Sequence, residues 1–283
     1  MTNIIQNLDQ TPEFAALIPS QLITKFRTVQ SQHPSNSSDP IDVEPKKAAL
    51  RELFGALMTT PTEDVKIQVE KLVERYSNMS ENEVANSPEG YLIPLVLELH
   101  RQFPSDIGIF CVYVLNIVNL RPGESIFLGS GEPHAYISGD IIECMATSDN
   151  VLRAGLTPKP RDVANLLESL TYNMGTPTKH MIAGTPWGSG DNDERTKTIL
   201  YDPPVSEFSV LNVQLKSGET EHHRGIDGPS VVIVTGGKGE MIGGMNKGSL
   251  MLEEGNVLFI GAGAEIIWRA RHGDFELFRA FCE

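Results

Sequence analysis

GESIFLGSGEPH, residues 123–134, and GNVLFIGAGAEI, residues 255–266, share one pattern of glycines. In each stretch five residues separate the first glycine from a second, and a third glycine follows after one further residue. Glycine accepts positive φ angles, so the Gly-x-Gly pair suits a tight turn between two strands. The pattern predicts a strand, a turn and a return strand in both places, with His134 beginning one return strand and Ile266 the other.

This spacing resembles the second conserved motif of the cupins, small antiparallel barrels that hold a metal ion between their strands. The family's usual proline at the turn is Gly129 in this chain, and its trailing asparagine is Ser138. Two copies of the motif indicate two barrels, and only the first copy retains a residue of the ligand type, His134. We therefore expect a bicupin whose second barrel keeps its shape without a metal.

A pair of adjacent histidines, His222 and His223, lies where cupins carry a further ligand motif of the form His-x-His with an acid. Neighbouring residues of a strand point to opposite faces of the sheet, so the pair does not present two ligands together. We expect a solvated hairpin here, and the alternative is that one of the two histidines binds a metal. Upstream of Gly123 there is no equivalent strand motif, and His33 and His100 fall on a loop and at a helix end.

The sequence up to about residue 118 is typical of helices. Apolar residues recur at helical spacing in residues 11–30, where Pro19 and Ser20 open a second helix, and again after Pro45, which suits a first helical turn. Residues 31–42 are rich in Ser, Pro, Asn and Asp and predict an exposed loop. Residues 105–118 predict a further buried helix.

After residue 119 short β-branched and aromatic runs alternate with turn residues, which is typical of an all-β barrel or sandwich. One helical segment interrupts them at residues 160–174, and residues 185–197 are polar and loop-like. We predict an α+β protein with bicupin β-barrels, the first one incomplete, and an inserted all-helical domain. The predicted domains are a helical domain, the remainder of the first barrel with a connecting helix, and the C-terminal barrel, at residues 1–118, 119–200 and 201–283.

Composition excludes several classes of protein. The 283 residues are 40% hydrophobic and 21% charged, which is ordinary for one large or two modest globular domains. A net charge of −14 argues against binding to nucleic acids or anionic membranes. Three widely spaced cysteines do not make a disulfide framework. Since we find no signal peptide and no apolar run of spanning length, we expect a soluble, cytoplasmic protein, with a monomer favoured.

The stretch PGESIFLGSGEPHAYISGDIIECMATSDNVLRAGLTPKPRDV, residues 122–163, resembles the signature region of the type I phosphomannose isomerases. The resemblance extends from about Thr11 to the end of the chain, and GEPHAY and DNVLRAGLTPK are its most specific parts. It implies a zinc-dependent enzyme that interconverts mannose 6-phosphate and fructose 6-phosphate and feeds the synthesis of GDP-mannose.

The resemblance also implies roles for single residues. His134 matches the zinc-ligand histidine of the family, and Arg153 matches its essential arginine. Four polar residues match positions that line the active-site cavity and contact substrate: Tyr136, Glu143, Asp149 and Lys159. Taken alone, the two acids would be read as solvated residues of hairpins and Lys159 as a solvated lysine of a loop. Their assignment to the active site therefore depends on the motif.

This set of residues fits aldose–ketose isomerisation through an enediol. Zinc polarises the oxygens of the substrate and lowers the energy of the developing enediolate charge. A guanidinium such as that of Arg153 stabilises an oxyanion or a phosphate with directed donors. A base then moves a proton between the two carbons.

The chain departs from the family at its beginning. The family's other zinc ligands are a glutamine and a histidine one residue apart on a strand and a glutamate on a later strand, and we find no counterpart of that segment here. A catalytic zinc needs about three protein ligands, so we expect this chain, as it stands, to bind zinc poorly and to isomerise little. Three alternatives remain: the chain is part of a longer, active isomerase, it is a truncated non-catalytic relative that binds or regulates, or it is an unrelated carbohydrate-responsive cupin.

Overall fold

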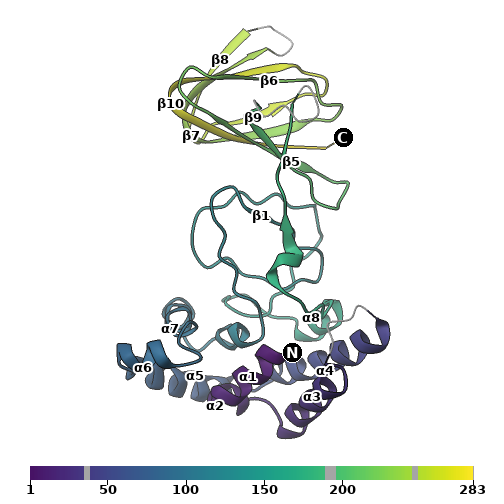
Figure 1. Cartoon of the computed structure of the whole chain (residues 1–283), viewed down its shortest axis with the longest axis vertical. Helices are drawn as coiled ribbons and strands as arrows, with labels where there is room; N and C mark the ends of the chain where they lie inside the picture. The colour runs from purple at the N-terminus through teal and green to yellow at the C-terminus, as the bar shows by residue number, and fades with distance from the viewer. Residues whose placement is uncertain (35–38, 189–195, 244–247, 283) are drawn as a thin grey trace. The chain divides into compact units, whose positions relative to one another are not determined.

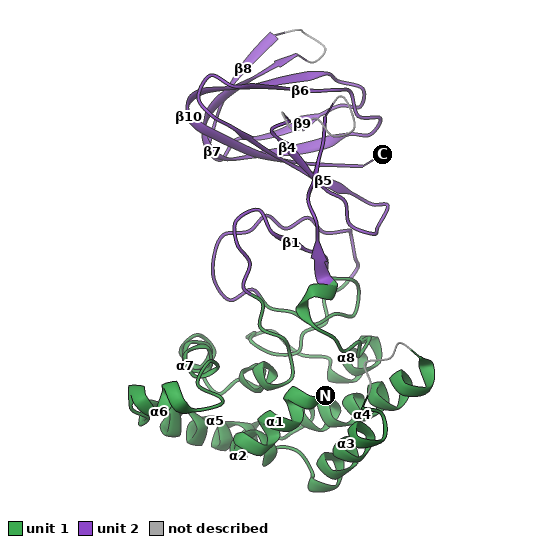
Figure 2. Ribbon diagram, in the orientation of Figure 1, with its two compact units in different colours: residues 1–118, 128–135, 150–179 green, residues 119–127, 136–149, 180–283 purple. Residues whose placement is uncertain are grey.

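The computed structural model (Figure 1) describes residues 1–34, 39–188, 196–243 and 248–282. The chain forms two compact units, coloured separately in Figure 2. Unit 1 comprises residues 1–118, 128–135 and 150–179, and unit 2 comprises residues 119–127, 136–149 and 180–283. The chain thus changes unit repeatedly within the signature region, and the division at residues 118 and 200 stays a prediction.

Unit 1 is built of helices, as predicted for residues up to about 118. Its described elements are α1 Thr2–Gln10, α2 Pro12–Ala15, α3 Ser20–Gln32, α4 Pro40–Met58, α5 Thr62–Ser77, α6 Glu81–Asn86, α7 Ile93–Gln102, the 3-10 helix η1 Ile107–Tyr113, and α8 Val163–Ser169. A short 3-10 helix, η2, follows at Pro177–His180. None of the helices that the structure describes combines the length and the apolar character needed to cross a bilayer.

The helix boundaries confirm one predicted start and correct another. Helix α3 begins at Ser20 directly after Pro19, as expected. Helix α4 begins at Pro40 and not near Pro45, because the Asp39 carboxylate accepts a hydrogen bond from the Ile41 amide at 2.9 Å and caps the first turn. Pro45 therefore lies inside the helix. Residues 35–38 of the predicted loop lie outside the described residues.

The predicted buried helix at residues 105–118 is the shorter 3-10 helix η1. The Asp106 carboxylate starts η1 by accepting a hydrogen bond from the Gly108 amide at 2.6 Å. Buried side chains of η1 join those of α2, α4, α5 and α7 in one apolar core. Helix α1 packs into the same core through Ile4 and Leu8, and Asn7 Nδ2 donates to the Tyr113 carbonyl at 2.8 Å. The first ten residues, which the resemblance left out, are thus part of the helical unit.

Unit 2 is built of antiparallel strands. A two-stranded sheet joins β1 Ser125–Ile126 to β2 Met181–Ile182. A larger sheet has the order β3-β4-β5-β10-β7-β8, with β6 paired to β10 and β9 to β7. The strands of the larger sheet are β3 Thr185–Pro186, β4 Thr198–Tyr201, β5 Ser209–Leu215, β6 Thr220–His223, β7 Ser230–Gly243, β8 Gly248–Glu253, β9 Val257–Ile260 and β10 Ile266–Phe281.

The structure is a mixed helix and sheet protein, but the predicted bicupin barrels are not confirmed. In the described residues the pairing path of the larger sheet begins at β3 and ends at β8, and no pairing joins these ends. Within the predicted first-barrel region, residues 119–200, the described pairings are those of β1 with β2 and of β3 with β4. A strand needs a neighbour that takes up its backbone hydrogen bonds, so strand-like residues without one stay irregular. Residues 189–195 of the predicted loop lie outside the described residues.

Candidate functional site

The two glycine turns have the same backbone conformation. The φ angles of the first glycines are +83° at Gly123 and +86° at Gly255, and those of the third glycines are +75° at Gly131 and +74° at Gly263. Only glycine adopts such angles without strain. The glycine conformations thus repeat, but the predicted return strands do not: β10 begins at Ile266, whereas the described residues have no strand at His134.

His134 lies three residues after the first turn, in unit 1, with an exposed side chain. Its Nδ1 is 2.9 Å from the backbone carbonyl oxygen of Glu132. Glu132 was not among the predicted site residues, yet its carboxylate lies at the centre of a cluster in the same unit. Thr171 Oγ1 donates to it at 2.6 Å, Asn173 Nδ2 at 3.4 Å and Lys179 Nζ at 3.5 Å.

The charge state of Glu132 follows from this cluster. Partial burial raises the pKa of the carboxyl, but the hydrogen bonds and the charge of Lys179 outweigh burial and hold the pKa below its usual value. Glu132 is thus a charged acceptor beside the turn. The sequence signal for it is weak, because its partners lie about forty residues further along the chain, beyond α8.

Arg153 is half-buried in a loop that packs against the start of η1, at Asp106 and Gly108. The Asp106 carboxylate accepts two hydrogen bonds, one from the Leu156 amide at 2.8 Å and one from the Gly108 amide of η1. A Cβ atom at Gly155 would meet the Cα of Gly108 at 2.7 Å, so the two segments approach as closely as glycines permit. This contact fixes the backbone next to Arg153, and it makes Asp106 a supporting residue that the sequence did not indicate.

The remaining predicted residues are at the surface of their units. Tyr136 and Glu143, in unit 2, are exposed, and the Tyr136 hydroxyl donates to the Glu143 carboxylate at 2.8 Å. Burial and the neighbouring carboxylate raise the pKa of Tyr136 to about 12. Asp149 is exposed in unit 2, and Lys159 is exposed in unit 1. The structure thus brings Tyr136 and Glu143 together.

The two adjacent histidines do point to opposite faces, but the expected solvated hairpin is wrong for one of them. His222 is half-exposed, whereas His223 is completely buried. Trp268 Nε1 donates to His223 Nδ1 at 3.1 Å, and Arg279 Nη1 is 3.3 Å from the same nitrogen. His223 Nε2 is 3.0 Å from the Thr198 hydroxyl. The side chain is therefore a member of the interior of unit 2.

The contacts of His223 fix its protonation. Indole and guanidinium groups only donate, so Nδ1 accepts and the proton of the neutral ring is on Nε2, facing Thr198. The Thr198 hydroxyl in turn donates to Glu221 at 3.1 Å. Burial, together with the charge of Arg279, lowers the pKa of His223 to about 3. Such a ring does not offer a lone pair to a metal, because its acceptor nitrogen is already engaged.

The residues present do not fit a zinc site by themselves. Within the described part of the chain, no group of three or more His, Cys, Asp or Glu side chains is placed to hold a metal ion. A catalytic zinc takes about three protein ligands and keeps one position open. His134 has the right chemistry for one of these ligands, but the described residues supply no complete set around it.

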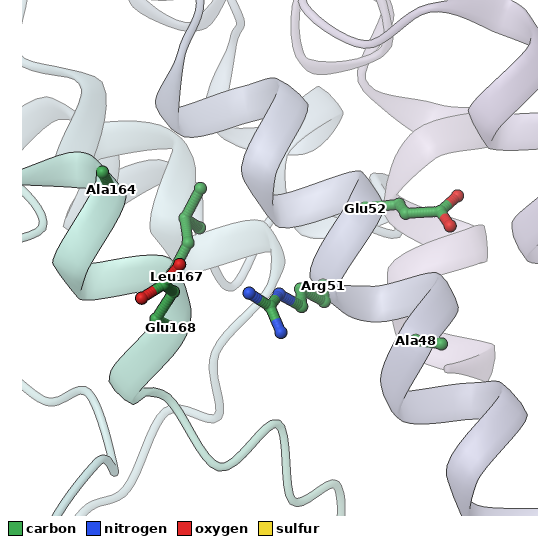
Figure 3. A pocket seen from close by; sticks show the side chains of 6 residues that line it. All are labelled: Ala48, Arg51, Glu52, Ala164, Leu167 and Glu168. Atoms are coloured by element: carbon green, nitrogen blue, oxygen red, sulfur yellow. The ribbon is translucent and has the colours of Figure 1, made fainter.

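A groove between α4 and α8 in unit 1 is distinct from these residues (Figure 3). Figure 3 shows the Arg51 side chain reaching from α4 toward α8. The groove is open, and its lining is Ala48, Arg51, Glu52, Ala164, Leu167 and Glu168. It contains none of the predicted site residues, and its mixture of short apolar and opposed charged groups marks a solvated helix junction.

Comparison with known proteins finds one family along the chain. A family model described as the helical insertion domain of phosphomannose isomerase type I matches residues 20–115, and one described as the phosphomannose isomerase type I C-terminal matches residues 198–245. A mannose-6-phosphate isomerase of Cryptococcus neoformans is 41% identical over 99% of this chain and 64% of its own length. The corresponding enzyme of Candida albicans is 39% identical over 100% of this chain and 65% of its own length.

Solved structures show the same fold. A variant of phosphomannose isomerase from Salmonella typhimurium superposes with a TM-score of 0.73 at 23% identity, covering 100% of this chain and 61% of that one. A zinc-bound mannose 6-phosphate isomerase superposes with a TM-score of 0.72 at 23% identity, covering 100% of this chain and 61% of that one. The chain thus spans slightly less than two thirds of the length of the proteins it matches.

Proposed function

The chain belongs to the type I phosphomannose isomerase family, and from this premise we propose that the protein is a mannose-6-phosphate isomerase that interconverts mannose 6-phosphate and fructose 6-phosphate. The observation that carries the proposal is the likeness to curated isomerases along almost the whole chain. The repeated turn supports a bicupin architecture for the family member, which we propose with it.

Arg153 is the residue that we propose for stabilising charge in the reaction. An aldose–ketose isomerisation passes through an enediol, and negative charge develops on the substrate oxygens as a proton moves between the carbons. Asp106 holds the backbone of the same loop at Leu156, and from this loop the guanidinium of Arg153 supplies directed donors for such an oxyanion or for the phosphate. Fixed donors need no reorganisation when the charge appears, so they stabilise the transition state more than water does.

Tyr136, Glu143, Asp149 and Lys159 are proposed to bind the sugar phosphate. The hydrogen bond between Tyr136 and Glu143 supports this for one pair, because it orients both polar ends at an exposed surface. Lys159 supplies a positive charge, which suits a phosphate. We further propose a cytoplasmic monomer whose product feeds the synthesis of GDP-mannose and which binds neither nucleic acid nor membrane, in line with its net charge of −14.

Zinc is proposed as the family's cofactor, with His134 as one ligand, because a solved relative is zinc-bound. The described residues of this chain do not complete a zinc site, so we propose that the polypeptide of residues 1–283 binds zinc weakly and turns over little. The alternative that we keep for this polypeptide is a non-catalytic binding or regulatory protein of the isomerase family.

Zinc content and turnover of the purified polypeptide distinguish these proposals. We expect well under one zinc per chain and little conversion of mannose 6-phosphate in a coupled assay that detects fructose 6-phosphate. Stoichiometric zinc with full turnover would contradict the proposed impairment and support the enzyme. Binding of mannose 6-phosphate without turnover, measured by calorimetry, would favour the non-catalytic alternative.

A chimera tests the isomerase directly. The part of the Cryptococcus neoformans relative that this chain does not match is joined to residues 1–283, and we expect zinc binding and turnover. Arg153→Ala in the chimera is expected to lower kcat/KM by about a hundredfold or more while zinc content stays unchanged. Equal losses of zinc and of turnover would instead assign Arg153 a structural role. A folded, zinc-bound chimera without turnover would overturn the proposed activity.

A further inference from the structure

Glu132 connects the first glycine turn to the segment that follows α8. Its side chain is mostly buried, with 16% of its area exposed, and accepts hydrogen bonds from Thr171, Asn173 and Lys179. The shortest of these bonds, 2.6 Å from the Thr171 hydroxyl, has the length of a strong bond to a charged acceptor. All four residues belong to unit 1, so the cluster lies within one compact unit.

The backbone of the turn is held by the same segment. The Thr171 amide donates to the Gly131 carbonyl at 3.1 Å, and the Glu132 amide donates to the Gly129 carbonyl at 3.3 Å. A Cβ atom at Gly131 would lie 2.4 Å from the Ser169 carbonyl oxygen, so the turn and the end of α8 are as close as a glycine allows. The position and direction of the Glu132 carbonyl are therefore set by both its side chain and its backbone neighbours.

That carbonyl is the partner of the imidazole of His134. A carbonyl oxygen accepts and never donates, so the His134 Nδ1 that lies 2.9 Å from it carries the proton of the neutral ring. The lone pair of the ring is then on Nε2. The hydrogen bond that one ring nitrogen makes sets which nitrogen acts as a base or a ligand.

We infer that Glu132 is a positioning residue, which through its cluster with Thr171, Asn173 and Lys179 orients its own carbonyl and so holds His134 in the Nδ1–H tautomer with its lone pair on Nε2. This inference rests on the proposed function for its meaning, because a ligand role for His134 needs a lone pair on a defined ring nitrogen. It does not need zinc or substrate to be tested.

Nuclear magnetic resonance of the imidazole nitrogens tests the inference on the 283-residue chain. Histidine labelled with ¹⁵N gives distinct long-range proton–nitrogen patterns for the two tautomers, and His134→Gln identifies the signals of His134. The spectra are taken well above the ordinary histidine pKa of about 6.5, where rings are neutral. We expect the Nδ1–H pattern in the wild type, and Glu132→Ala is expected to lower the ratio of Nδ1–H to Nε2–H by about tenfold.

Three variants separate positioning from general stability. Glu132→Gln retains an acceptor oxygen and is expected to keep most of the Nδ1–H tautomer. Thr171→Val removes the shortest bond and leaves Glu132 in place, so it is expected to give an intermediate ratio. Glu70→Ala removes an exposed glutamate of α5 and is expected to change nothing.

The Nε2–H pattern in the wild type would overturn the inference. So would an unchanged tautomer in both Glu132→Ala and Thr171→Val, because a cluster with a purely structural role lowers the melting temperature without moving the tautomer. If Glu132→Ala does not fold, Thr171→Val decides alone. Isomerase activity does not enter these spectra, so failure of the proposed function and failure of this inference are distinguishable.

Discussion

The two glycine turns have nearly the same glycine φ angles but different surroundings. Gly131 and Gly263 agree in φ to within the width of a normal turn, at +75° and +74°. A Cβ atom at Gly131 would collide with the end of α8, whereas a Cβ atom at Gly263 would meet nothing within 4 Å. The turn is followed by exposed His134 in one copy and by buried Ile266 in the other. A shared turn therefore carries the architecture, and the residue after it carries the difference in chemistry.

Two histidines extend the comparison, because their environments select opposite tautomers. His134 is exposed and faces a carbonyl acceptor with Nδ1, which therefore carries the proton. His223 is buried and receives donors from Trp268 and Arg279 at Nδ1, so its proton is on Nε2. The same type of side chain is thus exposed in unit 1, where we propose it as a ligand, and buried in the interior of unit 2.

We expect the largest difference in stability between two variants that replace one of these histidines with leucine, His223→Leu and His134→Leu. His223→Leu leaves the Arg279 guanidinium and the Trp268 indole without their acceptor in the interior, so we expect a loss of about 3 to 5 kcal/mol in the free energy of unfolding of unit 2. His134→Leu is expected to change stability by less than about 0.5 kcal/mol. Both tryptophans of the chain, Trp187 and Trp268, belong to unit 2, so tryptophan fluorescence during urea denaturation reports on that unit. Equal losses for the two variants would contradict the comparison.

The two third glycines provide a smaller contrast. Gly263→Ala adds the strain of a positive φ angle at a site with open space, about 1 kcal/mol. Gly131→Ala adds the same strain and also forces the turn away from the Ser169 carbonyl, so we expect a total of about 3 kcal/mol. Urea denaturation measures both losses of stability. Circular dichroism follows the helical unit for Gly131→Ala, and tryptophan fluorescence follows unit 2 for Gly263→Ala. Equal costs would show that the collision at Gly131 is relieved by a small shift, and a larger cost at Gly263 would contradict the comparison.

The dependence of the stability of unit 2 on pH provides a further test of the surroundings of His223. The pKa of His223 is about 3 in the folded protein and about 6.5 in the unfolded chain. Between these values the unfolded state binds the proton and the folded state does not, so stability is fully present above about pH 6.5 and falls as the pH decreases toward 3. From about pH 7 to about pH 5 we expect unit 2 to lose about 2 kcal/mol through this group.

The control for the pH effect is His223→Gln, which has a donor and an acceptor but no titrating ring. The wild type is expected to lose stability more steeply than this variant over the same range, by urea denaturation followed through tryptophan fluorescence. Parallel pH profiles would mean that His223 protonates without cost in the folded state, and the description of its surroundings would be wrong.

Local patterns explain most of what was predicted correctly. The glycine spacing predicted the repeated turn because positive φ angles are a property of single residues. Helical periodicity predicted the helices of unit 1. Pro19 located the start of α3, whereas Asp39 and not Pro45 sets the start of α4. The resemblance, carried by GEPHAY and DNVLRAGLTPK, predicted the family.

Contacts between distant segments explain what the sequence left open. Strands were predicted throughout residues 119–160, yet β1 is the strand described there, because strand formation depends on partners elsewhere in the chain. The partners of Glu132 and of Asp106 lie about forty and fifty residues away. No periodic pattern connects such positions.

By itself the sequence determined the helical and strand-rich regions, the two glycine turns and the family, since all of these follow from local conformation or from the order of residue types. The site residues that the family motif marks stay proposals. Only the tertiary structure decided that His223 is an interior residue and that Glu132 and Asp106 support the loops of His134 and Arg153. It also decided which ring nitrogen of His134 and of His223 carries the proton. The reason is physical: burial and hydrogen-bond direction are properties of a residue's neighbours in space, and the fold selects those neighbours from all along the chain.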